Sequence, residues 1–341
     1  MSDASLDRDA VVAIAGGGDG PGTSPRADDA APAQHHEAEI TTALPPGAHC
    51  VTDRPTPVGQ ASTGEAPTPF FQVYVSKPAD YPHTRSRLLL LLTGGTGIKS
   101  VNNQIQADRY ASEGFLVLMP DMFAGDDAPG ATAITDDSTS ILEQIKLKAA
   151  EMAKSFVIDM WLARVTPDRV MPILRRVIEA AHDQYGDAVR NGDGIYAVGY
   201  CVGGRFVILL ARETAPTAAA AAASAAAAAG DGGDQESAKP KTEGPYIRAG
   251  AIAHAASVAP EDFTDVKVPL SFACVEDDPL FPDAVRIHGE DLMAEYDLEH
   301  EVHVYPGVPH GFAVVGEYTD SAIRSAQATA YEQMLRWVQT H

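Results

Sequence analysis

The chain has 341 residues and a formal net charge of −22 at pH 7. Because contacts with phosphate groups need a basic surface, this charge argues against nucleic acid as a partner, and it argues equally against docking on anionic membranes. The length exceeds the usual single-domain size, but α/β folds often run this long as one unit.

Cysteine is rare in the chain, and the residues of this type are Cys50, Cys201 and Cys274. Their spacing fits neither a zinc motif nor a disulfide framework, so a reduced, intracellular setting is the simpler interpretation. No apolar run reaches transmembrane length, and the N-terminus lacks the apolar core of a signal peptide. We therefore expect a cytoplasmic protein that does not span a membrane.

Two segments have a biased composition. Residues 1–44 are rich in Asp, Ala, Gly and Pro without periodicity, which predicts a disordered acidic tail. Residues 214–244 carry an alanine tract followed by glycines and charged residues, with no apolar pattern that would dock on a core, so we expect a surface insertion. The rest of the chain, 45–341, is predicted to form one domain around this insertion.

Outside these segments, short apolar runs typical of buried strands alternate with longer runs typical of helices. In chain order we expect strands at 71–75 and 88–92, a helix at 103–113, a strand at 115–120, helices at 141–156 and 168–185, a strand at 195–198, a helical run at 205–211, strands at 249–254, 270–274 and 303–305, and a helix at 321–340. Pro167 and Pro172 are expected to break the helix at 168–185 near its start. The alternation predicts an α/β fold with a mostly parallel sheet, helices on both faces and ligands at the carboxyl ends of the strands.

The run GYCVGG at 199–204 follows a predicted strand and leads into a predicted helix. This order is typical of a nucleophile elbow, with Cys201 at the position where serine is usual. Glycines two residues before and two after the nucleophile make the tight turn possible, because larger side chains would collide with the strand or the helix. The pattern predicts a cysteine-dependent hydrolase, although Cys201 as a small apolar core residue remains the alternative.

A cysteine nucleophile needs a base and an acid that orients the base, and in α/β-hydrolases they follow in the order nucleophile, acid, histidine. Three acids, Glu276, Asp277 and Asp278, come directly after one of the later predicted strands, and His310 follows the next one. His310 is therefore the candidate base. His254 also ends a predicted strand, but it has no comparable partner; we expect a structural histidine, with a place at the border of the pocket as the alternative.

The glycine-rich run TGGTGIKS at 93–100 lacks the glycine before lysine that a phosphate loop requires, and it does not match the dinucleotide-binding fingerprint. It follows a buried strand at the place where α/β-hydrolases supply an oxyanion-hole amide. Gly94 and Gly95 let the backbone approach a substrate closely. We expect the backbone N–H groups of Gly95 and Val202 to hold the oxyanion.

Several motifs together resemble the dienelactone hydrolase family, in a form similar to its fungal-type members. They are GYCVGG at 199–204, DPLFP at 278–282, PHGF at 309–312, PDMFAGD at 120–126, and NNQ at 102–104 leading to ADRY at 107–110. The resemblance runs from about residue 49 to the C-terminus, apart from the insertion. The motifs are specific to the family but not to a substrate.

The resemblance implies an α/β-hydrolase fold that uses neither a metal nor an organic cofactor. It implies a triad of Cys201, His310 and Asp278, which selects Asp278 among the three acids. It also implies hydrolysis of a small-molecule ester or lactone. Bacterial members carry a carboxylate in the loop after the first buried strand, where it takes part in activating the cysteine, whereas this chain has Gly94.

Two further interpretations follow from the same residues. The missing loop carboxylate and the acidic, low-complexity segments are compatible with a non-catalytic hydrolase-fold protein that binds a ligand or a partner. A redox-sensing thiol at Cys201 would require Cys50 or Cys274 close by as a resolving cysteine.

Overall fold

The structure is a computed structural model that describes residues 72–128, 157–212 and 244–341. The predicted tail at 1–44 and the predicted helix at 141–156 lie outside the described residues. The predicted insertion at 214–244 also lies outside them, except for its last residue.

A single sheet organises the described residues. Its strands are β1 (Val73–Ser76), β2 (Arg87–Leu92), β3 (Phe115–Pro120), β4 (Ile195–Tyr200), β5 (Ala249–Ala253), β6 (Leu270–Val275) and β7 (His300–Tyr305). They lie in the order β1-β3-β2-β4-β5-β6-β7. Only β1 is antiparallel to its neighbour, and the other strands run parallel. The predicted mostly parallel sheet is therefore confirmed.

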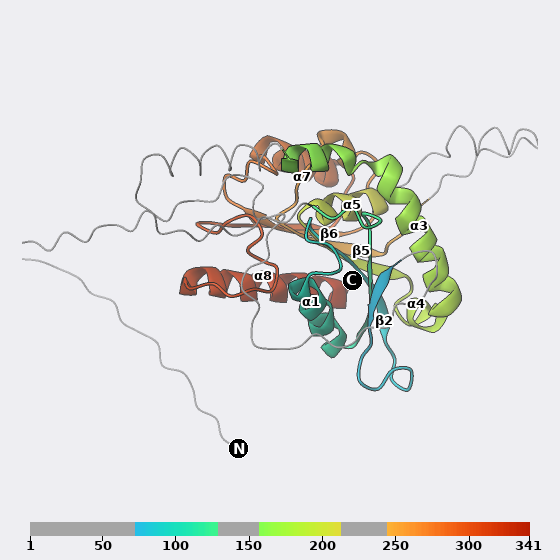
Figure 1. The fold of residues 1–341 in the computed structure, drawn as a ribbon. Helices are drawn as coiled ribbons and strands as arrows, with labels where there is room; N and C mark the ends of the chain where they lie inside the picture. The colour runs from blue at the N-terminus through green and yellow to red at the C-terminus, as the bar shows by residue number, and fades with distance from the viewer. Residues whose placement is uncertain (1–71, 129–156, 213–243) are drawn as a thin grey trace, which may run out of the picture. The chain divides into compact units, whose positions relative to one another are not determined.

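Helices cover both faces of this sheet (Figure 1). The helices are α1 (Val101–Ser112), α3 (Pro167–Gln184), α4 (Gly186–Asn191), α5 (Val202–Leu210), α7 (Asp283–Glu295) and α8 (Ser321–Thr340), with a 3₁₀ turn η2 (Pro260–Phe263). Buried side chains of α1 and α8 pack against one face, and those of α3, α4, α5 and α7 pack against the other. The prediction of an α/β fold with helices on both faces of the sheet is therefore confirmed.

Strand β2 shows why its sequence is apolar throughout. Leu88, Leu90 and Leu92 belong to the core on one face of the sheet, while Leu89 and Leu91 belong to the core on the other face. Successive side chains of a strand point to opposite faces, so a strand covered on both faces needs apolar residues at every position. This central strand carries the glycine-rich loop at its carboxyl end.

The prediction that prolines break the third long helix near its start is wrong, because α3 runs from Pro167 to Gln184 with Pro172 inside it. Pro167 is the first helical residue, where a missing N–H removes no helical hydrogen bond. Pro172 removes one bond, to the carbonyl of Asp168. Burial of side chains such as Leu174 on the core face of α3 offsets that loss.

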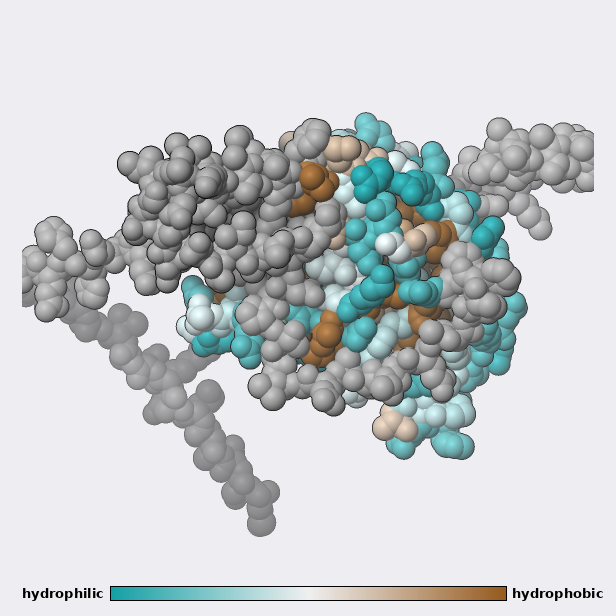
Figure 2. Space-filling view, viewed as in Figure 1, coloured by the Kyte–Doolittle hydropathy of each residue, from teal (hydrophilic) through white to brown (hydrophobic). Residues whose placement is uncertain are grey.

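On the face that Figure 2 shows, the described residues are mainly hydrophilic, with small apolar areas between polar ones. Large hydrophobic side chains that are exposed are Val101, Val157, Met160, Ile287 and Tyr296. Within 72–128, 157–212 and 244–341, no helix is long and apolar enough to cross a membrane. In the same ranges, no group of three or more His, Cys, Asp or Glu side chains has the arrangement of a metal site.

Candidate active site

Cys201 lies in a sharp turn between β4 and α5. Its backbone has φ 54° and ψ −125°, a combination that a residue with a side chain rarely adopts. Holding such a conformation costs of the order of 1–3 kcal/mol, and strain of this kind is concentrated at functional sites. The turn is held in place by two bonds to the end of β5: Cys201 N–H donates to the Ala253 carbonyl at 3.1 Å, and Ala256 N–H donates to the Cys201 carbonyl at 3.1 Å.

The flanking glycines are required by close packing. A Cβ atom on Gly199 would lie 2.7 Å from the Gly203 carbonyl oxygen, and one on Gly203 would lie 2.3 Å from the Leu92 carbonyl oxygen. Real Cβ atoms do not approach backbone atoms so closely. The spacing Gly-x-Cys-x-Gly is therefore a consequence of how tightly α5 packs against β2 and β4.

Asp278 and His310 meet at the carboxyl ends of β6 and β7. The Nδ1 of His310 is 2.7 Å from Oδ2 of Asp278, and both side chains are buried. The other carboxylate oxygen of Asp278 accepts the backbone N–H of Leu280 at 3.0 Å. Of the rival acids, Glu276 and Asp277 are both exposed. The structure thus brings His310 together with the acid that the resemblance selects.

The imidazole of His310 also interacts with the side chain of Cys201. Because Nδ1 is bonded to Asp278, the nitrogen that remains for Cys201 is Nε2. Burial by itself lowers the pKa of His310, but the charge of Cys201 and the hydrogen bonds to Asp278 and Cys201 outweigh burial and raise the pKa to about 10. The arrangement therefore favours the protonated form of His310 at neutral pH.

The glycine-rich loop after β2 approaches the thiol. A Cβ atom on Gly94 would lie 3.1 Å from Cβ and 3.8 Å from Sγ of Cys201. Gly95 follows in the same loop, and its carbonyl accepts the N–H of Ala128 at 3.0 Å. Val202 is the first residue of α5. Both predicted oxyanion donors therefore lie in segments that border Cys201.

Sequence reasoning missed the side chains that hold this loop. Asn103 Nδ2 donates to Thr96 Oγ1 at 3.0 Å and to the Gly97 carbonyl at 2.8 Å. Lys99 Nζ lies 3.5 Å from a carboxylate oxygen of Asp127, and burial raises the pKa of Asp127 above its ordinary value. The family-like NNQ run was the only signal for Asn103, and it indicated no role for that residue.

A second missed feature is the contact of His254 with His310. The ring centroids are 4.9 Å apart, with the planes at 65°. His254 is 1 % exposed and lies directly after β5. The sequence placed it only at the border of the pocket.

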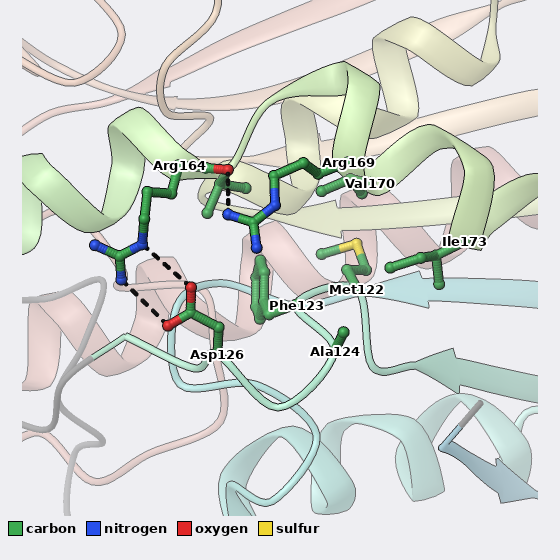
Figure 3. A pocket seen from close by; sticks show the side chains of 9 residues that line it. Met122, Phe123, Ala124, Asp126, Arg164, Arg169, Val170 and Ile173 are labelled. Carbon is green, nitrogen blue, oxygen red and sulfur yellow. Dashed lines mark hydrogen bonds and ion pairs between the residues drawn. The ribbon is translucent and has the colours of Figure 1, made fainter. Parts of the chain in front are cut away.

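A small hollow of about 100 Å³ lies beside the loop after β3 (Figure 3). Its apolar wall includes Met122, Phe123 and Ile173, and Arg164 on its rim forms two hydrogen bonds with Asp126. A larger hollow of about 520 Å³ lies at the amino ends of β4, β5 and β6. Ligands of parallel sheets bind at the opposite, carboxyl ends of the strands, which argues against the larger hollow as the substrate site.

The other cysteines give little support to a redox pair. Cys274 is buried on β6, and burial raises its pKa to about 12, which keeps it a thiol at neutral pH. Neither Cys201 nor Cys274 forms a disulfide. Cys50 lies outside the described residues.

A mostly parallel sheet with this elbow and this Asp–His pair at its strand ends defines an α/β-hydrolase. The model of the dienelactone hydrolase family matches residues 71–341, and the chain belongs to that family. It is accordingly a hydrolase of carboxylic ester bonds.

Similar proteins include fungal hydrolases. Hydrolase pyvD of Aspergillus violaceofuscus is 26% identical over 301 residues, which covers 87% of this chain and 97% of the relative. Dienlactone hydrolase 1 of Gibberella moniliformis is 25% identical over 268 residues, covering 78% and 82%. Among solved structures, a putative dienelactone hydrolase from Klebsiella pneumoniae has a TM-score of 0.55 at 15% identity, covering 83% of this chain and 98% of its own, which supports the fold alone.

Proposed function

We propose that the protein hydrolyses a small-molecule ester or lactone through an acyl-thioester on Cys201. The observation that carries this proposal is the buried His310, which is bonded to Asp278 at 2.7 Å and also interacts with Cys201 in the elbow. A histidine bonded on one side to a buried acid and on the other to a thiol is the arrangement that nucleophilic catalysis requires. A protein that only binds ligands has no need of it.

In the first half of the reaction, the Cys201 thiolate attacks the carbonyl carbon, and the carbonyl oxygen becomes an oxyanion. The carbon–oxygen bond to the leaving group then breaks, and the leaving alkoxide takes the proton held on Nε2 of His310. An acyl-thioester and an alcohol result. In a lactone, the alcohol stays attached to the acyl group.

In the second half, water attacks the thioester carbonyl and gives its proton to Nε2 of His310. The carbon–sulfur bond breaks, the carboxylic acid is released, and the thiolate and imidazolium are restored. Asp278 keeps the proton on Nδ1 throughout, so Nε2 remains the nitrogen that exchanges protons. These steps balance without a cofactor.

The oxyanion is assigned to the backbone N–H groups of Val202 and Gly95. Val202 begins a helix, where the first N–H groups have no partner within the helix. The contact of Gly94 with Cys201 supports an approach by the neighbouring Gly95 as well. Losing one such donor typically slows turnover by about 10²–10³-fold.

Esters and lactones are the substrate class that the family membership favours, and the name of the Gibberella relative refers to a dienelactone. With Gly94 in place of a carboxylate, we assign the class and not dienelactone itself. We also propose a cytoplasmic protein with no nucleic acid or membrane partner, an acidic tail at 1–44, and a hydrolase domain at 45–341 interrupted at about 214–244. The net charge of −22 supports the part of this proposal that concerns partners.

The test is a panel of small aryl esters and lactones assayed with the wild type and with Cys201→Ala. The proposal requires that Cys201→Ala abolish turnover and that intact-mass spectra of the wild type, taken soon after mixing with an activated ester, show one acyl adduct on Cys201. Full turnover by Cys201→Ala would refute it. Absence of both turnover and adduct in the wild type would instead support the ligand-binding interpretation.

A further inference from the structure

His254 lies immediately beside the elbow. It follows β5, the strand whose last carbonyl, that of Ala253, accepts the N–H of Cys201. Its own N–H donates to the Ala273 carbonyl of β6 at 2.8 Å. The backbone of His254 has a φ of 37°, which is unusual for a residue with a side chain. Its position is therefore fixed from both neighbouring strands.

The ring of His254 is enclosed by aromatic neighbours. It meets His310 edge to face at 4.9 Å, and its centroid lies 5.9 Å from that of Tyr200 and 6.1 Å from that of Phe312. Tyr200 is itself held by a buried hydroxyl contact of 3.0 Å with Tyr110. His254 thus rests on a rigid support and presents its ring to His310.

The hydrogen bonds of His310 at the two ends of its ring do not by themselves fix the tilt of the imidazole. The bond from Nδ1 to Asp278 holds one edge of the ring, but a rotation about that contact would move Nε2 away from the thiol. A packed neighbour removes this freedom, since buried rings interdigitate closely. Displacement of a reacting group by about 1 Å can slow an enzyme about 10²-fold.

We propose that His254 is a positioning residue for the reaction, whose ring holds the His310 imidazole at the angle that brings Nε2 to Sγ of Cys201. The inference rests on the proposed function of the same site. His254 acts through its ring contact with His310. The structure assigns this role to the ring and not to a proton carried by His254.

Two variants separate the ring from the rest of the side chain. His254→Asn removes the ring and suits the backbone, because asparagine tolerates positive φ better than most residues. His254→Phe keeps a ring in contact with His310 without imidazole nitrogens. The matched control is His303→Asn, which removes an exposed histidine whose ring lies tilted against that of Tyr305 on β7.

Three measurements are made on each full-length variant: kcat and KM on the best ester of the panel, the rate of iodoacetamide alkylation at Cys201, and the midpoint of thermal unfolding. We expect His254→Asn to lower kcat and the alkylation rate about 10–100-fold with KM within about threefold. We expect His254→Phe to recover both rates to within about fivefold of the wild type, and His303→Asn to change neither rate.

Wild-type kcat and alkylation in a folded His254→Asn protein would overturn the proposal. So would a His254→Phe protein that unfolds at the wild-type temperature but is as slow as His254→Asn, because the ring would then not be the cause. If Cys201→Ala keeps full turnover, the proposed function fails instead. The alkylation rates still test the contact between His254 and His310 in that case.

Discussion

Replacing Asp278 by asparagine tests how the buried acid controls the proton on His310. In the wild type, Oδ1 of Asp278 accepts the Leu280 N–H at 3.0 Å and Oδ2 meets Nδ1 of His310 at 2.7 Å. An asparagine of the same shape has only one oxygen. If the amide nitrogen faced the Leu280 N–H, two hydrogen-bond donors would face each other in a buried site without an acceptor. This would cost about 1–3 kcal/mol.

The asparagine oxygen is therefore expected to stay on Leu280, which turns the amide N–H toward His310. Nδ1 must then accept, so a neutral imidazole carries its proton on Nε2, the nitrogen that meets Cys201. That tautomer cannot take the proton of the thiol, and an imidazolium would point its Nδ1–H at another donor. We expect kcat to fall about 10³–10⁴-fold, as in triads with the same substitution, which corresponds to about 4–5 kcal/mol of transition-state stabilisation.

The assay is steady-state hydrolysis of an aryl ester, together with the rate of alkylation at Cys201, which should fall in parallel. Asp277→Asn is the matched control, because this neighbour is exposed and its φ of 52° suits asparagine. Its kcat should stay within about twofold of the wild type. A folded Asp278→Asn protein that retains more than about a tenth of wild-type kcat would refute the tautomer argument.

Further substitutions test the packing and the reactivity of the site. Gly203→Ala should abolish folding or soluble expression, because its Cβ would lie 2.3 Å from a backbone oxygen of β2. The control is Gly186→Ala, whose Cβ would meet only the end of a flexible arginine side chain. It should shift the unfolding midpoint upward by at most a few degrees. Gly94→Ala should leave the protein folded and lower the alkylation rate of Cys201 several-fold, since its methyl group would lie 3.1 Å from Cβ of that residue; an unchanged rate would contradict the contact. In peptide maps of native protein alkylated at pH 8, Cys201 should be modified and Cys274 protected, because burial raises the pKa of Cys274 to about 12; equal labelling of the two would show that this assignment is wrong.

The sequence predicted the parts of the fold that depend on local pattern. Strands buried on both faces, such as β2, are apolar at every position and are easily recognised. Strand β7 begins at His300, three residues before the predicted start, because it is an edge strand with partly exposed polar residues. Helix α7 was missed because its buried residues are only Gly289 and Met293, and the glycine packs against the ring of Phe263. A contact made by glycine leaves no apolar periodicity to detect.

The candidate site divides in a similar way. Cys201, Asp278 and His310 carry motif signals, since each follows a strand and the strands end at one edge of the sheet. His254 also follows a strand that ends at this edge, but its contact with His310 depends on how two rings that follow different strands are tilted toward each other. Asn103 lies in the first turn of α1, and its side chain donates hydrogen bonds to the glycine-rich loop. Such contacts follow from tertiary packing, and no local sequence pattern encodes them.

The loop position at Gly94 bears directly on how the proposed nucleophile is activated. A side chain there would begin 3.8 Å from Sγ of Cys201, so the position is one from which a carboxylate would reach the thiol. While it is charged, a carboxylate so close would oppose the thiolate, so it can take part in activating the cysteine only by accepting the thiol proton itself. With glycine there, a protonated His310 and the positive end of α5 both favour a thiolate at Cys201. Glycine at position 94 therefore fits a proposed nucleophile that is activated by His310 without a loop carboxylate.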